Sequence, residues 1–249
     1  GKVNKFKDSL QITIHDAYPH QQPNLSDFLP SSPRPIAEMS AELKDIINLL
    51  QEPYKKLLTH LLLTEPFFSE YINAPAAKTM HHAYVGGLLD HSLSMAKIAM
   101  QLADHYPHVN ADLLIAGTLV HDMGKVLEYS FSGAFDLSED GRLVGHITRA
   151  AIMLEKAAVE IGDIPEDQLR HLVHLILSHH GMMEWGSPVK PKTLEAVLLH
   201  QIDLLDSRVQ GYFDYLEADK SEGAWTSKVS PMHQVRLRHW DDSQEAESA

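Results

Sequence analysis

The chain has 249 residues, of which 44% are hydrophobic and 22% are charged, the ordinary composition of a globular protein. No apolar run approaches the ~18 residues that a membrane-spanning helix needs, and the absence of cysteine excludes disulfides and thiolate metal sites. A formal net charge of −13 argues against a broad nucleic-acid-binding face. The sequence also lacks a signal-peptide pattern, so we expect a cytoplasmic protein that contacts no membrane.

The first 35 residues predict a small β module followed by a linker. Apolar residues alternate with polar ones in segments 3–7 and 10–14, which indicates a hairpin. An isolated hairpin is only marginally stable, so we expect it either to pack on the main body or to be the remnant of a larger β module. Five prolines between residues 19 and 35 predict a linker or a wrapping arm.

Helical periodicity begins at Ile36 and continues over most of the chain. In the first half, we expect helices over segments 36–51, 53–63, 65–71, 86–106 and 112–121. The last of these helices is apolar on all sides, which predicts that it is buried.

Residues 126–145 interrupt the helical pattern. We predict a hairpin there, with strands over 131–137 and 142–144 and a turn at Asp140-Gly141. Helices resume over 146–161, 165–179 and 193–218. The sequence therefore predicts one all-α domain at 36–220 with a small β-hairpin insertion, preceded by the module and linker at 1–35. A C-terminal extension at 221–249 follows, with an acidic tail that we expect to be disordered.

The pair His121-Asp122, at the end of the buried helix, is the most informative feature of the sequence. A neutral imidazole and a carboxylate side by side can bind one cation, and His91 and Asp203 from two other helices could complete the site. A carboxylate in the apolar surroundings of Asp203 needs a partner, either a cation or the nearby Arg208. Nitrogen and oxygen donors of this kind suit Mn²⁺, Fe²⁺, Co²⁺, Ni²⁺ or Zn²⁺ better than Ca²⁺.

Further histidines lie at the ends of predicted helices. His146 begins one helix, and His179-His180 end another, where both rings could turn toward a single cation. The helix dipole would equally favour such a pair as ordinary surface residues. His171 and His174, one turn apart on the same helix, fit amphipathic surface positions.

Several charged residues near these positions are candidates for substrate binding. Lys125 could return to the pocket and bind a phosphate oxygen, or it could remain a solvated side chain near a helix end. Arg149 and Arg208 are further candidate phosphate ligands. Asp206, one turn along the last helix from the candidate ligand, could order a water molecule or a histidine.

The order of these residues resembles the pattern of the HD superfamily of metal-dependent phosphohydrolases, in which a His, a His-Asp pair and an Asp follow one another. The resemblance covers about residues 75–220 and implies an HD-type helical bundle. It also implies two divalent ions bridged by Asp122, with the second ion held by His146, His179 and His180. The implied metal ligands are therefore His91, His121, Asp122, His146, His179, His180 and Asp203.

The closer resemblance is to the YhaM-type 3′-to-5′ exoribonucleases, through segments 84–95, 121–125 and 176–189. Those proteins have an OB-type β-barrel before the helical domain, and residues 1–20 resemble only its last strands. The HD-GYP phosphodiesterases match less well. The Gly-Tyr-Pro signature is missing after His180, and Gly87 stands where some of them have a Glu, which favours two metals over three.

We therefore predict a metal-dependent phosphodiesterase, a 3′-to-5′ exoribonuclease that acts on single-stranded RNA or short oligonucleotides through a metal-activated water. Asp122 and Lys125 are the expected catalytic residues, and Lys125, Arg149 and Arg208 the expected substrate-binding ones. Mn²⁺ is the preferred cofactor, with Fe, Co, Ni, Zn or Mg as alternatives. Two other functions remain open: a nucleotidase or cyclic-nucleotide phosphohydrolase acting on small phosphate esters, and a metal-stabilised scaffold without turnover.

Overall fold

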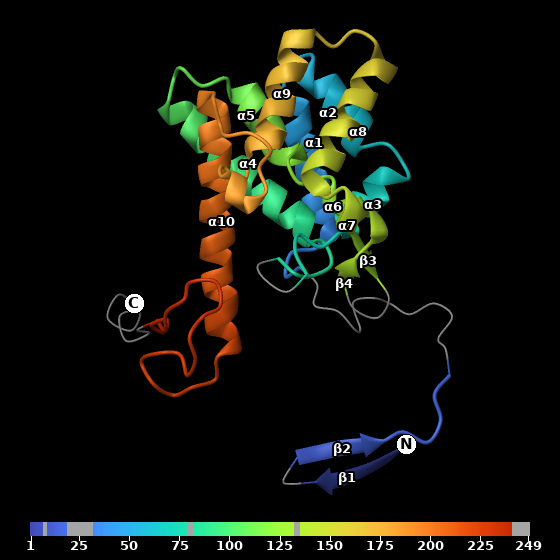
Figure 1. Cartoon of the computed structure of the whole chain (residues 1–249), viewed down its shortest axis with the longest axis vertical. Coiled ribbons are helices and arrows are strands. Elements are labelled where there is room, and N and C mark those ends of the chain that lie inside the picture. The colour runs from blue at the N-terminus through green and yellow to red at the C-terminus, as the bar shows by residue number, and fades with distance from the viewer. Residues whose placement is uncertain (7–8, 19–31, 79–81, 132–134, 241–249) are drawn as a thin grey trace.

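The structure is a computed structural model that describes residues 1–6, 9–18, 32–78, 82–131 and 135–240. Within these ranges the chain is mainly helical, and its named strands form two small antiparallel hairpins (Figure 1). The predicted all-α class is therefore confirmed. Most of the predicted linker and the acidic tail from residue 241 lie outside the described residues. Among the described helices, none combines the length and apolarity that a bilayer crossing requires.

The helical body begins with three helices whose apolar stripes face inward. They are α1 (Ile36–Leu49), α2 (Tyr54–Leu62) and α3 (Phe67–Asn73). On α1, Met39, Leu43 and Ile47 recur at helical spacing and are at most 1% exposed. The three helices contact one another, and each also contacts α4 or α5, so together they cover one side of the central helices.

The centre of the body is the pair α4 (Gly87–His105) and α5 (Ala111–Val120). Helix α5 begins at Asn110, whose side chain accepts a hydrogen bond from the backbone N–H of Leu113 at 3.1 Å. From Leu113 to Val120 every residue of α5 is buried, as its uniformly apolar sequence predicts. The helix contacts α2, α4, α9 and α10, and its C-terminal end therefore lies among several other helices.

The second half contributes α8 (His146–Ile161), α9 (Glu166–Ser178) and α10 (Leu194–Ala218). Helix α10 contacts α4, α5 and α9 and extends beyond the rest of the body (Figure 1). Residues 219–240 fold back along this extension. Tyr215 donates a hydrogen bond to the carbonyl of Val229 at 3.1 Å, and the rings of Phe213 and Trp240 stack with centroids 5.4 Å apart.

The segment between α5 and α8 differs from the prediction. It contains α6 (Lys125–Glu128), β3 (Tyr129–Phe131), β4 (Phe135–Leu137) and α7 (Glu139–Leu143). The hairpin exists, but β3 pairs with β4, and the residues predicted as its second strand belong to α7 and the residue that ends it. The reason is a helix cap: the Ser138 hydroxyl accepts a hydrogen bond from the N–H of Gly141 at 2.9 Å. A Ser followed by acidic residues starts a helix as readily as it makes a turn.

The predicted N-terminal hairpin is also present, as β1 (Lys2–Phe6) paired antiparallel with β2 (Ser9–Thr13). Its apolar residues Val3, Phe6, Leu10 and Ile12 are 59–79% exposed. Most of their surface is therefore open to solvent, and among the described residues the expected packing on the main body is not seen. That the hairpin is the remnant of a larger β module stays a prediction.

Candidate metal centre

The candidate site is built around Asp122, which follows the last turn of α5. His121 ends that helix and is fully buried. Its Nδ1 lies 2.9 Å from the carbonyl oxygen of Thr118, one of the carbonyls that a helix end leaves without an intrahelical partner. This contact turns Nε2 of His121 toward the carboxylate of Asp122, whose Oδ2 atom is 3.2 Å away. The end of the apolar helix thus places both residues of the pair at one point in the core.

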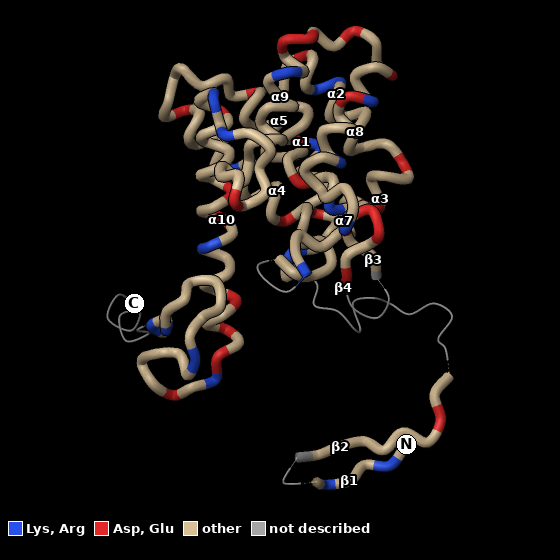
Figure 2. Tube along the Cα trace, in the orientation of Figure 1, with Lys and Arg blue, Asp and Glu red and all other residues tan. Residues whose placement is uncertain are grey.

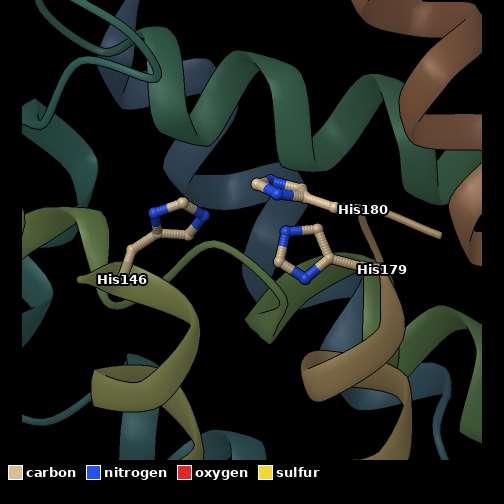
Figure 3. A group of neighbouring side chains, drawn as sticks. All are labelled: His146, His179 and His180. Atoms are coloured by element: carbon tan, nitrogen blue, oxygen red, sulfur yellow. The ribbon is translucent and has the colours of Figure 1, made fainter. Parts of the chain in front are cut away.

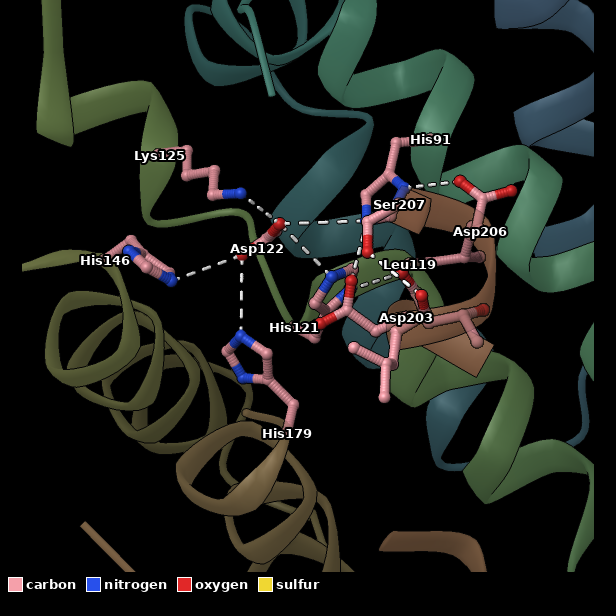
Figure 4. A network of polar contacts seen from close by, with 12 residues as sticks. His91, Leu119, His121, Asp122, Lys125, His146, His179, Asp203, Asp206 and Ser207 are labelled. Carbon is pink, nitrogen blue, oxygen red and sulfur yellow. Dashed lines mark hydrogen bonds and ion pairs between the residues drawn. The ribbon is translucent and has the colours of Figure 1, made fainter. Parts of the chain in front are cut away.

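Two further residues predicted as ligands reach the Oδ2 side of Asp122, from α4 and from α10. Nε2 of His91 lies 3.3 Å from Oδ1 of Asp203 and 4.0 Å from Oδ2 of Asp122 (Figure 4). His91, His121 and Asp203 each offer a donor atom, and these atoms lie within 4.8 Å of one another. The contacts of α10 with α4 and α5 bring these residues together, although His91 and Asp203 are 112 positions apart in the sequence.

The other oxygen of Asp122 faces two histidines from α8 and the end of α9. Oδ1 lies 3.4 Å from Nε2 of His146 and 3.6 Å from Nε2 of His179 (Figure 4). His180 joins them: its ring centroid is 4.4 Å from that of His179 and 5.3 Å from that of His146 (Figure 3). The donor atoms of these three histidines also lie within 4.8 Å of one another. All seven predicted metal ligands therefore converge on one place, divided between the two oxygens of Asp122.

Four buried polar atoms in this cluster have no hydrogen-bond partner among the described residues. They are Nε2 of His121, His146 and His179 and Oδ1 of Asp122. Buried polar atoms are nearly always paired, and several such atoms directed at the same space indicate a missing positive partner. Imidazole and carboxylate donors are the usual ligands of divalent transition metals, so the residues present fit the metal that the sequence predicts.

The protonation states within the cluster also suit a cation. Burial raises the pKa of Asp122, but Lys125 and His121 outweigh that effect and hold the pKa well below its usual range. Burial and the neighbouring His121 lower the pKa of His179 well below its ordinary value, and burial with His146 lowers that of His180. The chain therefore keeps the carboxylate ionised and these imidazoles neutral, the forms in which they bind metals.

His91 differs from the other histidines because carboxylates lie on both sides of its ring. Burial disfavours its charged form, but hydrogen bonds with Asp203 and Asp206 raise its pKa to about 9. The same interaction with His91 lowers the pKa of Asp203 against the opposing effect of burial. Without a metal ion, a proton on His91 balances the two carboxylates; a cation beside Nε2 would take that place.

Lys125 returns to the site as predicted. Its Nζ atom is 2.6 Å from Oδ2 of Asp122, and its side chain is 13% exposed. Burial opposes its charge, but the attraction of Asp122 raises the pKa of Lys125 above its ordinary value. Together with His146, also 13% exposed, and Asp203, 19% exposed, Lys125 forms the side of the cluster that solvent reaches.

The two arginines predicted to bind substrate lie in different settings. Arg149 on α8 donates from Nε to Oδ2 of Asp140 at 2.9 Å and from Nη2 to Oδ1 of the same carboxylate. Arg208 is an exposed residue of α10. Their role in substrate binding stays a prediction.

The structure adds residues around the cluster that the sequence did not single out or left open. Glu128, at the end of α6, pairs with Nδ1 of His146, a contact that no sequence spacing indicates because 17 residues separate the two. Asp206 contacts Nδ1 of His91 at 2.7 Å, so of its two predicted roles it orders a histidine. His200 Nδ1 contacts the carbonyl of His179 at 2.9 Å and steadies the end of α9.

Comparisons with known proteins identify the family of the chain. The family described as "HD domain" matches residues 88–208, which include all seven converging residues, and a family described as a putative helicase matches residues 43–112. The 3′-5′ exoribonuclease YhaM of Bacillus subtilis (strain 168) is 37% identical over 232 residues, which are 92% of this chain and 73% of that protein. YhaM of Listeria monocytogenes serotype 4b is 39% identical over 210 residues, 83% of this chain and 66% of that protein.

Among solved structures, the HD domain of the Listeria monocytogenes phosphodiesterase PgpH superposes with a TM-score of 0.39 and 19% identity. The superposition covers 62% of this chain and 80% of that one.

Proposed function

This chain belongs to the HD-domain family of the YhaM 3′-to-5′ exoribonucleases, and we propose from that premise that it removes nucleotides one at a time from the 3′ end of single-stranded RNA or short oligonucleotides. It is a metal-dependent hydrolase. The observation that supports the proposal best is the arrangement around Asp122, whose two oxygens each face a separate set of imidazole nitrogens.

We assign one ion to each side of that carboxylate. The first ion would be held by Asp122 with His91, His121 and Asp203, and the second by Asp122 with His146, His179 and His180. Mn²⁺ is the first choice because the donors are imidazoles and carboxylates without a thiolate, and Fe, Co, Ni, Zn and Mg remain alternatives. The four unpaired buried atoms of the cluster support this assignment.

Two divalent ions held by these residues would supply a hydroxide from water near neutral pH and would neutralise the oxygens of the scissile phosphate. The chain's own groups prepare for this chemistry. Lys125 and His121 keep Asp122 ionised, and burial keeps His179 and His180 neutral. Lys125, at the solvent side of the cluster, places its ammonium where it can bind a phosphate oxygen and stabilise the charge that develops during cleavage.

The charge distribution of the chain suits a substrate that binds at the centre rather than along a wide face. The net charge is −13, and Lys and Arg are dispersed among acidic residues over the helical body (Figure 2). Attraction of a phosphodiester must then come from the site itself, where bound cations would make the local field positive. We propose residues 36–220 as the catalytic domain, 1–35 as the remnant of an OB-type module with its linker, and 221–249 as an extension.

The test is a time course with RNA oligonucleotides labelled at the 5′ end, in the presence of Mn²⁺. We expect a ladder of labelled products that shorten one nucleotide at a time from the 3′ end, together with release of mononucleotides. Immediate release of a labelled mononucleotide would contradict the polarity. Hydrolysis of nucleoside monophosphates or cyclic nucleotides alone would favour the second candidate, a phosphohydrolase of small esters.

The site assignment is tested with Asp122→Ala and the matched variant Asp45→Ala, which removes an exposed carboxylate of α1. The first change should abolish turnover and remove at least one ion from the protein, as measured by elemental analysis. The second should alter neither quantity. Activity retained in Asp122→Ala would refute the bridging role.

A further inference from the structure

In each imidazole of the proposed ligand set, Nδ1 contacts an oxygen atom of the protein, and Nε2 is left to face the centre of the cluster around Asp122. Three of the five rings contact main-chain carbonyls: His121 with Thr118 at 2.9 Å, His179 with Ile176 at 2.7 Å and His180 with Trp185 at 2.6 Å. For the first two, the acceptor lies three residues earlier, in the last turn of a helix. Carbonyls there have no intrahelical partner, so the helix end itself supplies the acceptor.

The other two rings cannot use that solution. His91 is the fifth residue of α4, where the preceding carbonyls already accept helical hydrogen bonds, and His146 is the first residue of α8, so no earlier turn of its own helix lies before it. In both cases a carboxylate from another element takes the place of the carbonyl. Nδ1 of His91 is 2.7 Å from Oδ2 of Asp206 (Figure 4). Nδ1 of His146 pairs with Oε2 of Glu128.

Both carboxylates are themselves held in place by a second contact. Asp206 is 8% exposed and accepts a hydrogen bond from the hydroxyl of Ser94 on α4. Glu128 accepts the backbone N–H of His146 at 3.1 Å in addition to its contact with the ring. Each carboxylate therefore fixes the orientation of the imidazole in front of it.

The two rings held in this way stand on opposite sides of the bridging carboxylate. His146 faces Oδ1 of Asp122 at 3.4 Å, whereas His91 lies on the Oδ2 side at 4.0 Å. We propose that Glu128 and Asp206 are positioning residues, one for each of the two ions. Each orients one imidazole, holds it in the tautomer with the proton on Nδ1 and makes Nε2 a stronger donor.

This inference rests on the proposed two-ion site, and the experiment separates the two claims. Binding of Mn²⁺ is measured by equilibrium dialysis and by electron paramagnetic resonance of free Mn²⁺, on the full chain. The variants are Glu128→Gln and Asp206→Asn, which keep size and an acceptor oxygen but remove the charge. The matched control is Glu160→Gln, because Glu160 pairs with His60 at 2.9 Å on the surface, outside the cluster.

We expect each of the two variants to bind one of two ions about 10–100-fold more weakly, and the Glu160 control to bind both ions as the unmodified chain does. To learn which carboxylate serves which ion, each charge-removing change is combined with His146→Ala and, separately, with His91→Ala. In His146→Ala, Asp206→Asn should weaken the remaining ion and Glu128→Gln should have no effect. In His91→Ala the two effects should be reversed. If the two carboxylates had a purely structural role, each charge-removing change would weaken the remaining ion to the same extent in both backgrounds.

Unchanged Mn²⁺ affinity in both charge-removing variants would overturn the inference about the positioning residues. Loss of one ion in His91→Ala and of one ion in His146→Ala would still support the proposed two-ion site. Unchanged binding in those two alanine variants would instead refute the proposed site. Circular dichroism of the metal-free proteins checks folding. If Glu128→Gln does not fold, because Glu128 also holds the first N–H of α8, the Asp206 variant alone decides the outcome.

Discussion

Gly124→Ala is the substitution for which the structure gives the sharpest expectation. Gly124 stands two residues after Asp122 and has φ −64° and ψ −17°, an ordinary helical conformation. A methyl group should therefore be tolerated by the backbone, and an alanine in such a position usually stabilises a protein by about 0.4–1 kcal/mol. The surroundings oppose this gain: a Cβ at residue 124 would lie 2.2 Å from the carbonyl oxygen of His146 and 3.0 Å from the backbone nitrogen of Ala150.

The obstacle is the backbone of α8, which cannot turn aside as a flexible side chain can. Relieving the contact requires the start of α6 and the start of α8 to separate by roughly 1 Å. Overpacking of this kind costs about 1–3 kcal/mol, which corresponds to a fall in Tm of about 2–12 °C for a chain of this size. The same separation moves His146 away from Asp122, now 3.4 Å apart, and a displacement of about 1 Å at a reaction centre can reduce the rate about 100-fold.

The assay compares Tm, Mn²⁺ affinity and kcat/KM on RNA for Gly124→Ala and for Gly223→Ala. Gly223 is the matched control because a Cβ there would meet its nearest atom, the carbonyl oxygen of Trp225, at 3.8 Å. We expect losses in all three quantities for the first variant and none for the second. A Gly124→Ala protein with unchanged or raised Tm and full Mn²⁺ affinity would refute the reasoning from close packing.

Three other perturbations have definite expected outcomes. Chelation with EDTA should lower Tm reversibly, since each ion at 100 times its Kd adds about 2.7 kcal/mol of stability; an unchanged Tm would argue against a bound metal. Lys125→Gln should reduce kcat/KM about 100–1,000-fold while two ions remain bound, because it removes the charge that we propose binds the reacting phosphate; loss of both ions would instead show that Lys125 maintains the site. Burial, with Lys192 and His171 nearby, lowers the pKa of His174. The stability that neutral His174 contributes is therefore present above pH ~6.5 and is lost as the pH falls below that value. We expect the free energy of unfolding, measured with urea, to decline less steeply at acid pH in His174→Gln than in the unmodified chain. An equally steep decline in both proteins would contradict this.

Helix positions were well determined by local sequence patterns. The stripe of apolar residues from Ile36 predicted α1, and the uniformly apolar segment before His121 predicted the buried helix α5. The segment between α5 and α8 was less predictable. Ser138 and the residues after it fit a turn as well as a helix start, and only the hydrogen bond from Gly141 to the Ser138 hydroxyl distinguishes the two.

The sequence by itself determined the types of donor atom and the helices that carry them, because those follow from residue identity and from a periodicity of a few residues. Only the tertiary structure decided which oxygen of Asp122 each imidazole faces and which group holds each ring from behind. Glu128 and Asp206 meet His146 and His91 through contacts between different elements of the fold. Such pairings depend on how whole helices pack, to within about 0.5 Å, and no spacing along the chain encodes them.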